Sequence, residues 1–290
     1  MIVISESLVL SATDADFDTD NPLILWDNKV STSNIRSADV ATGAAVVEDP
    51  SYPTINMANP STGGLNYFKQ LSAGQSIFFE WMDVNNDEDI DCLAVAGHNF
   101  GDGLRVLQVY AATTVDGSGD PVYATVTQDV VVANNWPLMF RFTADVYIAV
   151  KLVMTASGTS DKVRAAVLSV GKLLICERKV QATFTPLPYG RKRQVTSGMS
   201  ESGQFLGRNV VGQKVETSCT LAFMSPDWYR DNFEPFADAS GTATFFFAWA
   251  PVSYPLEVGY AWLMNDAIPQ ISHTYPELFQ ITLDMQGIVE

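Results

Sequence analysis

The sequence predicts a mainly β protein: an N-terminal β-sandwich or jelly roll, followed by a second β-sandwich with one short helix. Short segments rich in Val, Ile, Leu, Phe and Tyr alternate with clusters of Gly, Asn, Asp, Ser and Pro, as in strands joined by turns. Helical periodicity is almost absent before position 225. The length of 290 residues exceeds the usual size of one hydrophobic core. We therefore expect two domains, although one large sandwich also fits.

The expected parts are an N-terminal arm at residues 1–21, a jelly-roll domain at 22–180 and a second β domain at 181–290. In the arm, an extended chain places four alternating carboxylates on one edge, those of Asp14, Asp16, Asp18 and Asp20. The four carboxylates either form a cation site, belong to an arm that docks on a basic surface, or lie on a solvated acidic segment. Short charge runs are weak signals, which favours the solvated segment.

Composition excludes several classes of partner. The chain has 17 Lys and Arg against 33 Asp and Glu, and its net charge of −16 repels phosphate and anionic lipid, so we expect no nucleic-acid partner. No run approaches the roughly 20 apolar residues of a membrane helix, and Met1–Leu10 lacks the basic start of a secretory signal. The three cysteines are an odd number without a C-x-x-C pair, so we expect neither a disulfide framework nor a metal site.

In the first domain, the segment around residue 150 shows the clearest strand pattern. Val146, Ile148, Val150, Leu152 and Met154 share one face of an extended chain, as in a strand with one buried side. Further strands are predicted at Ile77–Trp81, Ile90–Ala96, Leu104–Ala111, Val122–Val132, Tyr147–Met154, Val163–Ser169 and Lys172–Val180. Seven or more strands at this spacing favour a sandwich or jelly roll.

Three stretches of this domain resemble a known family. They are the Asn-rich run Tyr52–Lys69 followed by Ile77–Trp81, the segment Cys92–Phe100, and the closing strands Val163–Val180. Their order resembles a discoidin-like, galactose-binding-like jelly roll. The resemblance implies ligand loops at one end of the sandwich, which here contain Asn56, Asn59, Asn66, Tyr67, His98 and Asn99.

The second domain combines strands with one helix signal. Val215, Thr217, Cys219, Leu221 and Phe223 alternate on one strand face, and a last strand carries Phe279, Ile281, Leu283 and Met285 on one face. Between them, Ser225 is a natural N-cap and Pro226 suits the first helical position. Tyr229, Phe233 and Phe236 then fall on one side of a helix of two to three turns.

This half also resembles a family. The relevant residues are Arg193 with Ser200–Arg208, the aromatic helix with Asp227–Tyr229, and the aromatic segments Phe245–Pro251, Tyr254–Pro255 and Tyr260–Trp262. Their order is similar to minor tail proteins of long-tailed bacteriophages, which build the tail tip. The resemblance implies the tail-tube and distal-tail-protein fold, a tail-tube-like β-sandwich flanked by a helix. The dense aromatics form either an intersubunit or sugar-stacking surface, or a sheet core covered on both sides, and the alternation of Phe245–Ala248 favours the core.

A basic island lies in this acidic chain. Residues 172–214 hold eight of the seventeen Lys and Arg residues, among Gly, Ser and Pro that are typical of a linker and long loop. The island is a nucleic-acid patch, a solvated loop, or a loop docked on an acidic neighbouring subunit. The net charge disfavours nucleic acid, and we favour a subunit interface. Its residues would be Arg178, Lys179, Arg191, Lys192, Arg193 and Arg208.

Candidate chemical sites are weak. Asp83–Asp91 starts like a calcium loop but has Glu88 and Ala94 where an EF-hand needs Gly and Glu, which leaves an irregular cation site or an acidic turn. His98 and His273 are the only histidines, and neither lies in a nucleophile motif. We therefore expect no enzyme, no catalytic residue and no cofactor.

The sequence leads to one main hypothesis and one alternative. The main hypothesis is a structural subunit of a bacteriophage tail tip: a homo-oligomeric ring, hexamer or trimer, that joins the tail tube to the tip or receptor-binding parts. Its partners would be tube, hub and fibre proteins, and it would reside in the virion tail after assembly in the host cytoplasm. The alternative is a carbohydrate-binding module that binds host surface glycans through the jelly roll.

Overall fold

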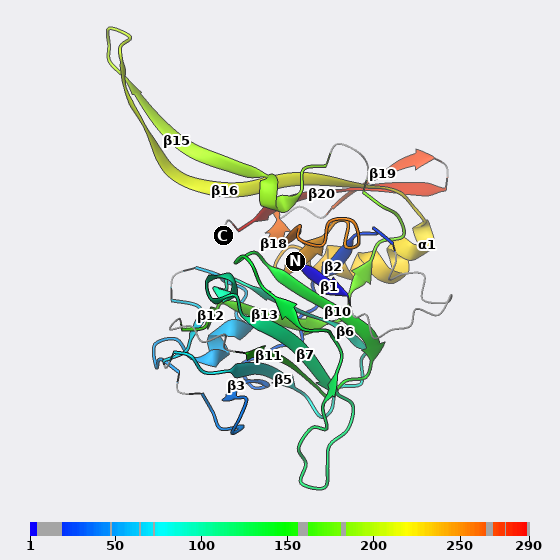
Figure 1. Ribbon diagram of the computed structural model, residues 1–290. Coiled ribbons are helices and arrows are strands. Elements are labelled where there is room, and N and C mark those ends of the chain that lie inside the picture. The colour runs from blue at the N-terminus through cyan, green and yellow to red at the C-terminus, as the bar shows by residue number, and fades with distance from the viewer. Residues whose placement is uncertain are drawn as a thin grey trace.

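Three β-sheets are stacked on one another, and a long two-stranded ribbon projects from the third (Figure 1). The computed structural model describes residues 1–4, 19–46, 48–63, 65–71, 73–155, 162–180, 184–264, 269–275 and 277–288. Asp14, Asp16 and Asp18 of the acidic arm lie outside these residues. Within them, no helix is long and apolar enough to cross a membrane.

The first two sheets form the expected N-terminal sandwich. One has the strand order β3-β5-β11-β7-β8, with β9 also paired to β7, and the other has the order β1-β10-β6-β13. The bounds are β1 Ile2–Ile4, β3 Ile35–Asp39, β5 Ile77–Met82, β6 Ile90–Ala96, β7 Val106–Ala112, β8 Ala124–Thr125, β9 Val130–Val131, β10 Leu138–Asp145, β11 Ala149–Thr155 and β13 Val167–Gly171. Two short strands, β4 Phe68–Lys69 and β12 Arg164–Ala165, pair beside the sandwich.

The core of the sandwich follows the alternation that the sequence shows. On β11, Val150, Leu152 and Met154 are buried between the two sheets, whereas Lys151 and Val153 are half-buried on the outer face. Phe79, Trp81 and Phe140 fill the same core and are at most 1% exposed. The predicted strands Val122–Val132 and Lys172–Val180 are wrong in length, because only two-residue strands form in each.

The third sheet has the order β14-β2-β17-β18-β20-β16-β15, with β19 paired to β20. Its strands are β2 Leu23–Leu25, β14 Leu174–Ile175, β15 Arg191–Met199, β16 Phe205–Met224, β17 Thr244–Ala248, β18 Val258–Leu263, β19 Gln270–Tyr275 and β20 Leu278–Gly287. Residues 23–25 and 174–175 come from the expected first domain but pair in this sheet. These apolar segments of three and two residues are too short to show a period that identifies their sheet.

The aromatic run of β17 is core, as its alternation favoured. Phe245 and Phe247 pack with the helical segment and β20, whereas Phe246 faces the sandwich. On the sandwich side, Tyr260 of β18 donates a 2.6 Å hydrogen bond to the carbonyl oxygen of Pro60. The third sheet is therefore covered on both faces and is fixed to the sandwich by apolar and polar contacts.

The predicted helix is confirmed as one helical segment made of α1 Pro226–Trp228, a π-turn at Tyr229–Phe233 and α2 Glu234–Ala239. The Ser225 hydroxyl accepts a 3.2 Å hydrogen bond from the backbone nitrogen of Trp228, which is the expected N-cap. Phe233 and Phe236 are fully buried, and Phe236 meets Phe245 edge-on with ring centroids 5.3 Å apart.

The predicted alternation of buried side chains on β16 is interrupted near the end of the strand. Val215, Cys219 and Leu221 are buried as expected, but a bulge follows at Phe223, where φ is +63°. Because the bulge adds one residue, Met224 points into the core and Phe223 is only half-buried. Alternation alone cannot reveal this shift.

Candidate assembly site

The segment expected as a linker and loop is instead a β-ribbon, residues 191–214. β15 and the first half of β16 pair from Arg191↔Val215 to Met199↔Phe205, with bulges after Gln194 and Gly198. The turn is closed by a 2.8 Å hydrogen bond from the backbone nitrogen of Ser200 to the carbonyl oxygen of Gln204. Neither face of the ribbon is buried against the rest of the chain, so its sequence shows no regular apolar–polar alternation. Its Gly and Ser residues are therefore easily taken for those of a loop.

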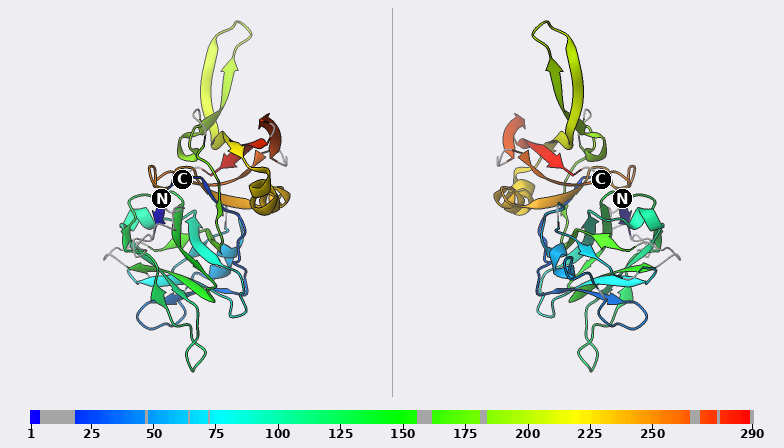
Figure 2. Two further views of the ribbon diagram at one scale, coloured as in Figure 1. Left: turned by 90° about the vertical axis from the view of Figure 1, so that its right-hand side faces the viewer. Right: turned by 90° about the vertical axis from the view of Figure 1, so that its left-hand side faces the viewer.

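The ribbon projects beyond the rest of the chain, which we call the body. In both side views no other element lies beside its outer part (Figure 2). Its register gives it two different faces, since residues directly opposite one another share a face. We call the first the apolar–basic face; it carries Arg191, Arg193, Val195, Met199, Phe205, Arg208 and Val210. We call the other the glycine face; it carries Lys192, Gln194, Thr196, Gly198, Gly207, Asn209, Gly212 and Lys214. Leu206 lies on the glycine face, beside Gly198.

The apolar–basic face continues the buried face of the third sheet. Val215, on the same side of β16, is 2% exposed and belongs to the core. Further along that side, Val210 is 52% exposed, Phe205 is 67% exposed and Met199 is 69% exposed. Large apolar side chains thus extend a core row into solvent, as is typical of a surface that another protein covers.

The six basic residues predicted at a subunit interface fall into two groups. Arg191, Lys192, Arg193 and Arg208 lie on the ribbon, whereas Arg178 and Lys179 follow β14 in the body. Arg193 and Arg208 are exposed, and neither forms an ion pair with any residue that the structure describes. Lys179 pairs with Asp20 of the body at 3.3 Å.

Lys192 and Lys214 share one carboxylate where the ribbon meets the rest of the sheet. Both form ion pairs with Glu216, Lys192 at 2.9 Å, and their hydrogen bonds lower the pKa of that carboxyl below its ordinary value. Beside them, a short 3₁₀ turn, Leu187–Tyr189, places the buried side chain of Leu187 over β18. The ribbon therefore leaves the body at a well-packed junction.

The asparagine side chains of the predicted ligand loops form hydrogen bonds within the chain. The side-chain amides of Asn56, Asn66 and Asn99 donate to the carbonyl oxygens of Tyr67, Ser61 and Lys162 at 3.1, 2.6 and 2.8 Å. The side chain of Asn59 accepts a 3.0 Å hydrogen bond from the backbone nitrogen of Ser61.

The Tyr67 ring stacks on Tyr52 with centroids 4.4 Å apart, and Lys69 and Arg164 lie over the two rings at 5.2 and 5.5 Å. Protein side chains therefore already cover part of both the Tyr52 and the Tyr67 ring.

His98 has a structural environment. Its Nε2 donates to the carbonyl oxygen of Trp136 at 2.8 Å, while Nδ1 accepts from the backbone nitrogen of Phe100 at 3.3 Å. Both ring nitrogens are therefore occupied in the neutral tautomer. Burial lowers the pKa of His98 to about 3.

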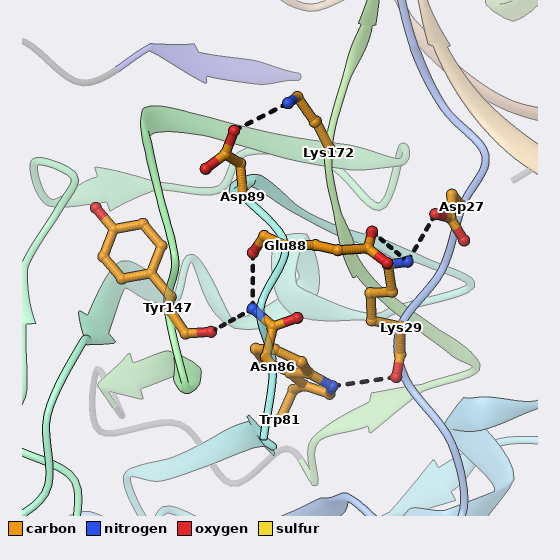
Figure 3. A network of polar contacts seen from close by, with 8 residues as sticks. All are labelled: Asp27, Lys29, Trp81, Asn86, Glu88, Asp89, Tyr147 and Lys172. Atoms are coloured by element: carbon orange, nitrogen blue, oxygen red, sulfur yellow. Dashed lines mark hydrogen bonds and ion pairs between the residues drawn. The ribbon is translucent and has the colours of Figure 1, made fainter. Parts of the chain in front are cut away.

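The acidic turn at 83–91 is held by lysines (Figure 3). Lys29 forms ion pairs with Asp27 and Glu88 at 2.8 and 2.7 Å, and Lys172 pairs with Asp89 at 3.0 Å. The amide of Asn86 donates to the carbonyl oxygens of Glu88 and Tyr147. In the part of the chain that the structure describes, no group of three or more His, Cys, Asp or Glu could hold a metal ion. These contacts favour the acidic turn over the cation site.

A polar groove on the sandwich was missed by the sequence. It is an open groove of about 550 Å³ lined by Ser31, Ser33, Asn34, Ile35, Arg36, Glu80, Met82, Asp83 and Val84. The fully buried carboxylate of Glu80 accepts from Nε of Arg36 and from the hydroxyl of Tyr123. Lys151 lies next to it, 3.7 Å from the ring centroid of Tyr123, and burial lowers the pKa of this lysine. The strand register Arg36↔Glu80↔Lys151 assembles the cluster, which sequence spacing does not show.

Comparison with known proteins gives only distant matches. No family model matches the chain, and no curated protein does. Among solved structures, a chitosan-binding module from a Paenibacillus chitosanase/glucanase aligns with a TM-score of 0.39 at 10% identity, over 50% of this chain and 98% of that one. A family 32 carbohydrate-binding module from Clostridium perfringens, in complex with galactose, aligns at 0.34 and 13% identity, over 51% and 99%. A Ruminococcus gnavus GH29 fucosidase aligns at 0.36 and 12% identity, and the match spans only 24% of the enzyme.

Proposed function

We propose that this chain is a structural subunit of a multi-protein assembly, a bacteriophage tail tip, and that its ribbon engages a neighbouring protein. The ribbon carries the proposal: a two-stranded hairpin alone in water is marginally stable, and this one exposes Met199, Phe205 and Val210 on one face. A covering partner would remove that apolar surface from water. The tail tip as the setting rests on the sequence resemblance of residues 185–290 to minor tail proteins.

Electron microscopy with antibody labelling of purified particles tests this role. We expect the chain at the tail tip of intact virions, and a chain found only as free monomer and absent from particles would refute the proposal. The matched variants are R193E with R208E, because both side chains are exposed and outside the ion pairs at the ribbon root. These changes should leave folding intact and exclude the chain from particles. K162E with R178E, both exposed positions outside the ribbon, is the control of equal charge change.

We propose glycan binding by the sandwich as a second function, and the groove at Arg36 supports it. Nε of Arg36 donates to the buried Glu80, while the Arg36 side chain is 56% exposed and lines the groove together with Asp83 and two serines. Paired donors and acceptors of this kind suit the adjacent hydroxyl groups of a sugar. A glycan screen with the full chain should give saturable binding that R36A abolishes and R178A retains. Binding unchanged by R36A would refute this site.

A further inference from the structure

The ribbon has unequal faces, and its charge opposes that of the rest of the chain. Residues 191–214 contain five basic and one acidic residue, whereas the remainder contains twelve basic and thirty-two acidic residues. From this we infer that the apolar–basic face of one copy docks on the acidic body of a second copy, in a head-to-tail contact. This inference rests on the proposed assembly function and names its partner.

Like charge disfavours the symmetric arrangement. If two copies met through the same ribbon face, Arg193 and Arg208 of both copies would lie in one interface, and close pairs of like charge are unfavourable. Docking on the acidic remainder of a second copy avoids this repulsion, because each guanidinium group then lies near carboxylates. A contact between two different surfaces is heterologous, and it repeats from copy to copy until a ring closes or a filament grows.

The two faces differ in what they can bury. The apolar–basic face offers Val195, Met199, Phe205 and Val210 in two cross-strand pairs, Val195 with Val210 and Met199 with Phe205. The glycine face has Gly198 opposite Gly207 and carries polar side chains on either side of this pair, so Leu206 is the large apolar side chain placed on it. Burial of apolar area drives most protein association, so the apolar–basic face is the docking face.

Phe205 and Leu206 provide a matched pair of test positions. They are adjacent, each is 67% exposed, and they lie on opposite faces of the ribbon. In analytical ultracentrifugation of the full chain, F205S should weaken self-association by about tenfold or more, the cost of one interface anchor. L206S should leave it within about twofold. Equal effects of the two substitutions would overturn the choice of face.

A ribbonless variant distinguishes head-to-tail from symmetric contact. Lys192 and Lys214 are directly opposite, so Asn-Gly can join them in place of residues 193–213. This variant can accept a ribbon from the unaltered chain but offers none, so adding it should reduce the mean oligomer size as its proportion rises. A size that stays unchanged would overturn the head-to-tail contact. Circular dichroism confirms that the variant is folded.

One outcome separates this inference from the proposed function. If the unaltered chain stays monomeric at every concentration, a second copy is not the partner. The proposed structural role would still hold if the unaltered chain were found in particles and the double variant, R193E with R208E, were not. If that variant also entered particles normally, both proposals would fall.

Discussion

Leu187 lies directly against Gly259 at the root of the ribbon: a Cβ atom built on Gly259 would be 2.3 Å from Cδ1 and 2.6 Å from Cβ of Leu187. Only a residue without a side chain lets the 3₁₀ turn before β15 pack on β18. We expect G259A to displace Leu187 and to destabilise the fold by about 1–3 kcal/mol, the usual cost of overpacking. Urea denaturation measures it. G241A is the control, because open space surrounds that glycine. Equal stability of the two variants would contradict the packing.

Ser225 links the helical segment to Glu177, which follows β14. Its hydroxyl caps Trp228 and also contacts the carboxylate of Glu177 at 2.8 Å. We expect S225A to lower the free energy of unfolding by about 1 kcal/mol, because the first turn loses its side-chain cap. Thermal unfolding followed by circular dichroism gives the value. S218A, an exposed strand position on β16, should change stability by less than about 0.5 kcal/mol, and a similar loss there would contradict the capping role.

Asp91 makes stability depend on pH. Burial raises the pKa of Asp91 from 3.8 to about 6, although its carboxylate accepts a 2.7 Å hydrogen bond from the backbone nitrogen of Leu173. The folded state therefore binds a proton at a pH where the unfolded state does not. Its contribution to the free energy of unfolding falls as pH rises from about 4 to about 6. D91N removes this dependence.

The comparison of D91N with the unaltered chain isolates Asp91 from His98. The lowered pKa of His98 acts in the opposite direction, since its contribution rises with pH between about 3 and 6.5. In urea titrations at several pH values, D91N should gain up to about 3 kcal/mol relative to the unaltered chain between pH 4 and pH 7, as a two-unit shift implies. Parallel stability curves would contradict the shift.

Tyr123 covers the buried carboxylate of Glu80. Its hydroxyl donates to Glu80, and this contact together with burial raises the pKa of Tyr123. Y123F leaves one carboxylate oxygen without this donor, so we expect a loss of about 1–3 kcal/mol in chemical denaturation. Y254F is the control because Tyr254 is 51% exposed and should tolerate the change. A neutral Y123F would show that the contact contributes nothing to stability.

Calcium should not stabilise the chain through the turn at 83–91. The ammonium groups of Lys29 and Lys172 already neutralise Glu88 and Asp89, and a bound cation would have to displace them. We expect the same melting temperature with calcium chloride and with EDTA in differential scanning fluorimetry. A rise with calcium that K172A enhances would instead establish a cation site there.

Local patterns were enough to predict the mainly β class, the central strands and the helix. Burial on one face imposes a period of two on β11 and β20, and the cap at Ser225 with the aromatic spacing of Phe233 and Phe236 marks the helix, because these signals depend only on near neighbours in the chain. The bulge at Phe223 left no such signal.

The sequence by itself determined that the chain is acidic, β-rich and built around one basic segment, since charge and alternation are properties of single stretches. Only the tertiary structure decided what that segment is. Pairing across the ribbon sets Phe205 and Arg208 on one face and Leu206 on the other, and it brings Arg36, Glu80 and Lys151 together from three strands. Strand register is set by contacts between residues far apart in the sequence, so neither face of the ribbon nor the groove can be read from the order of residues.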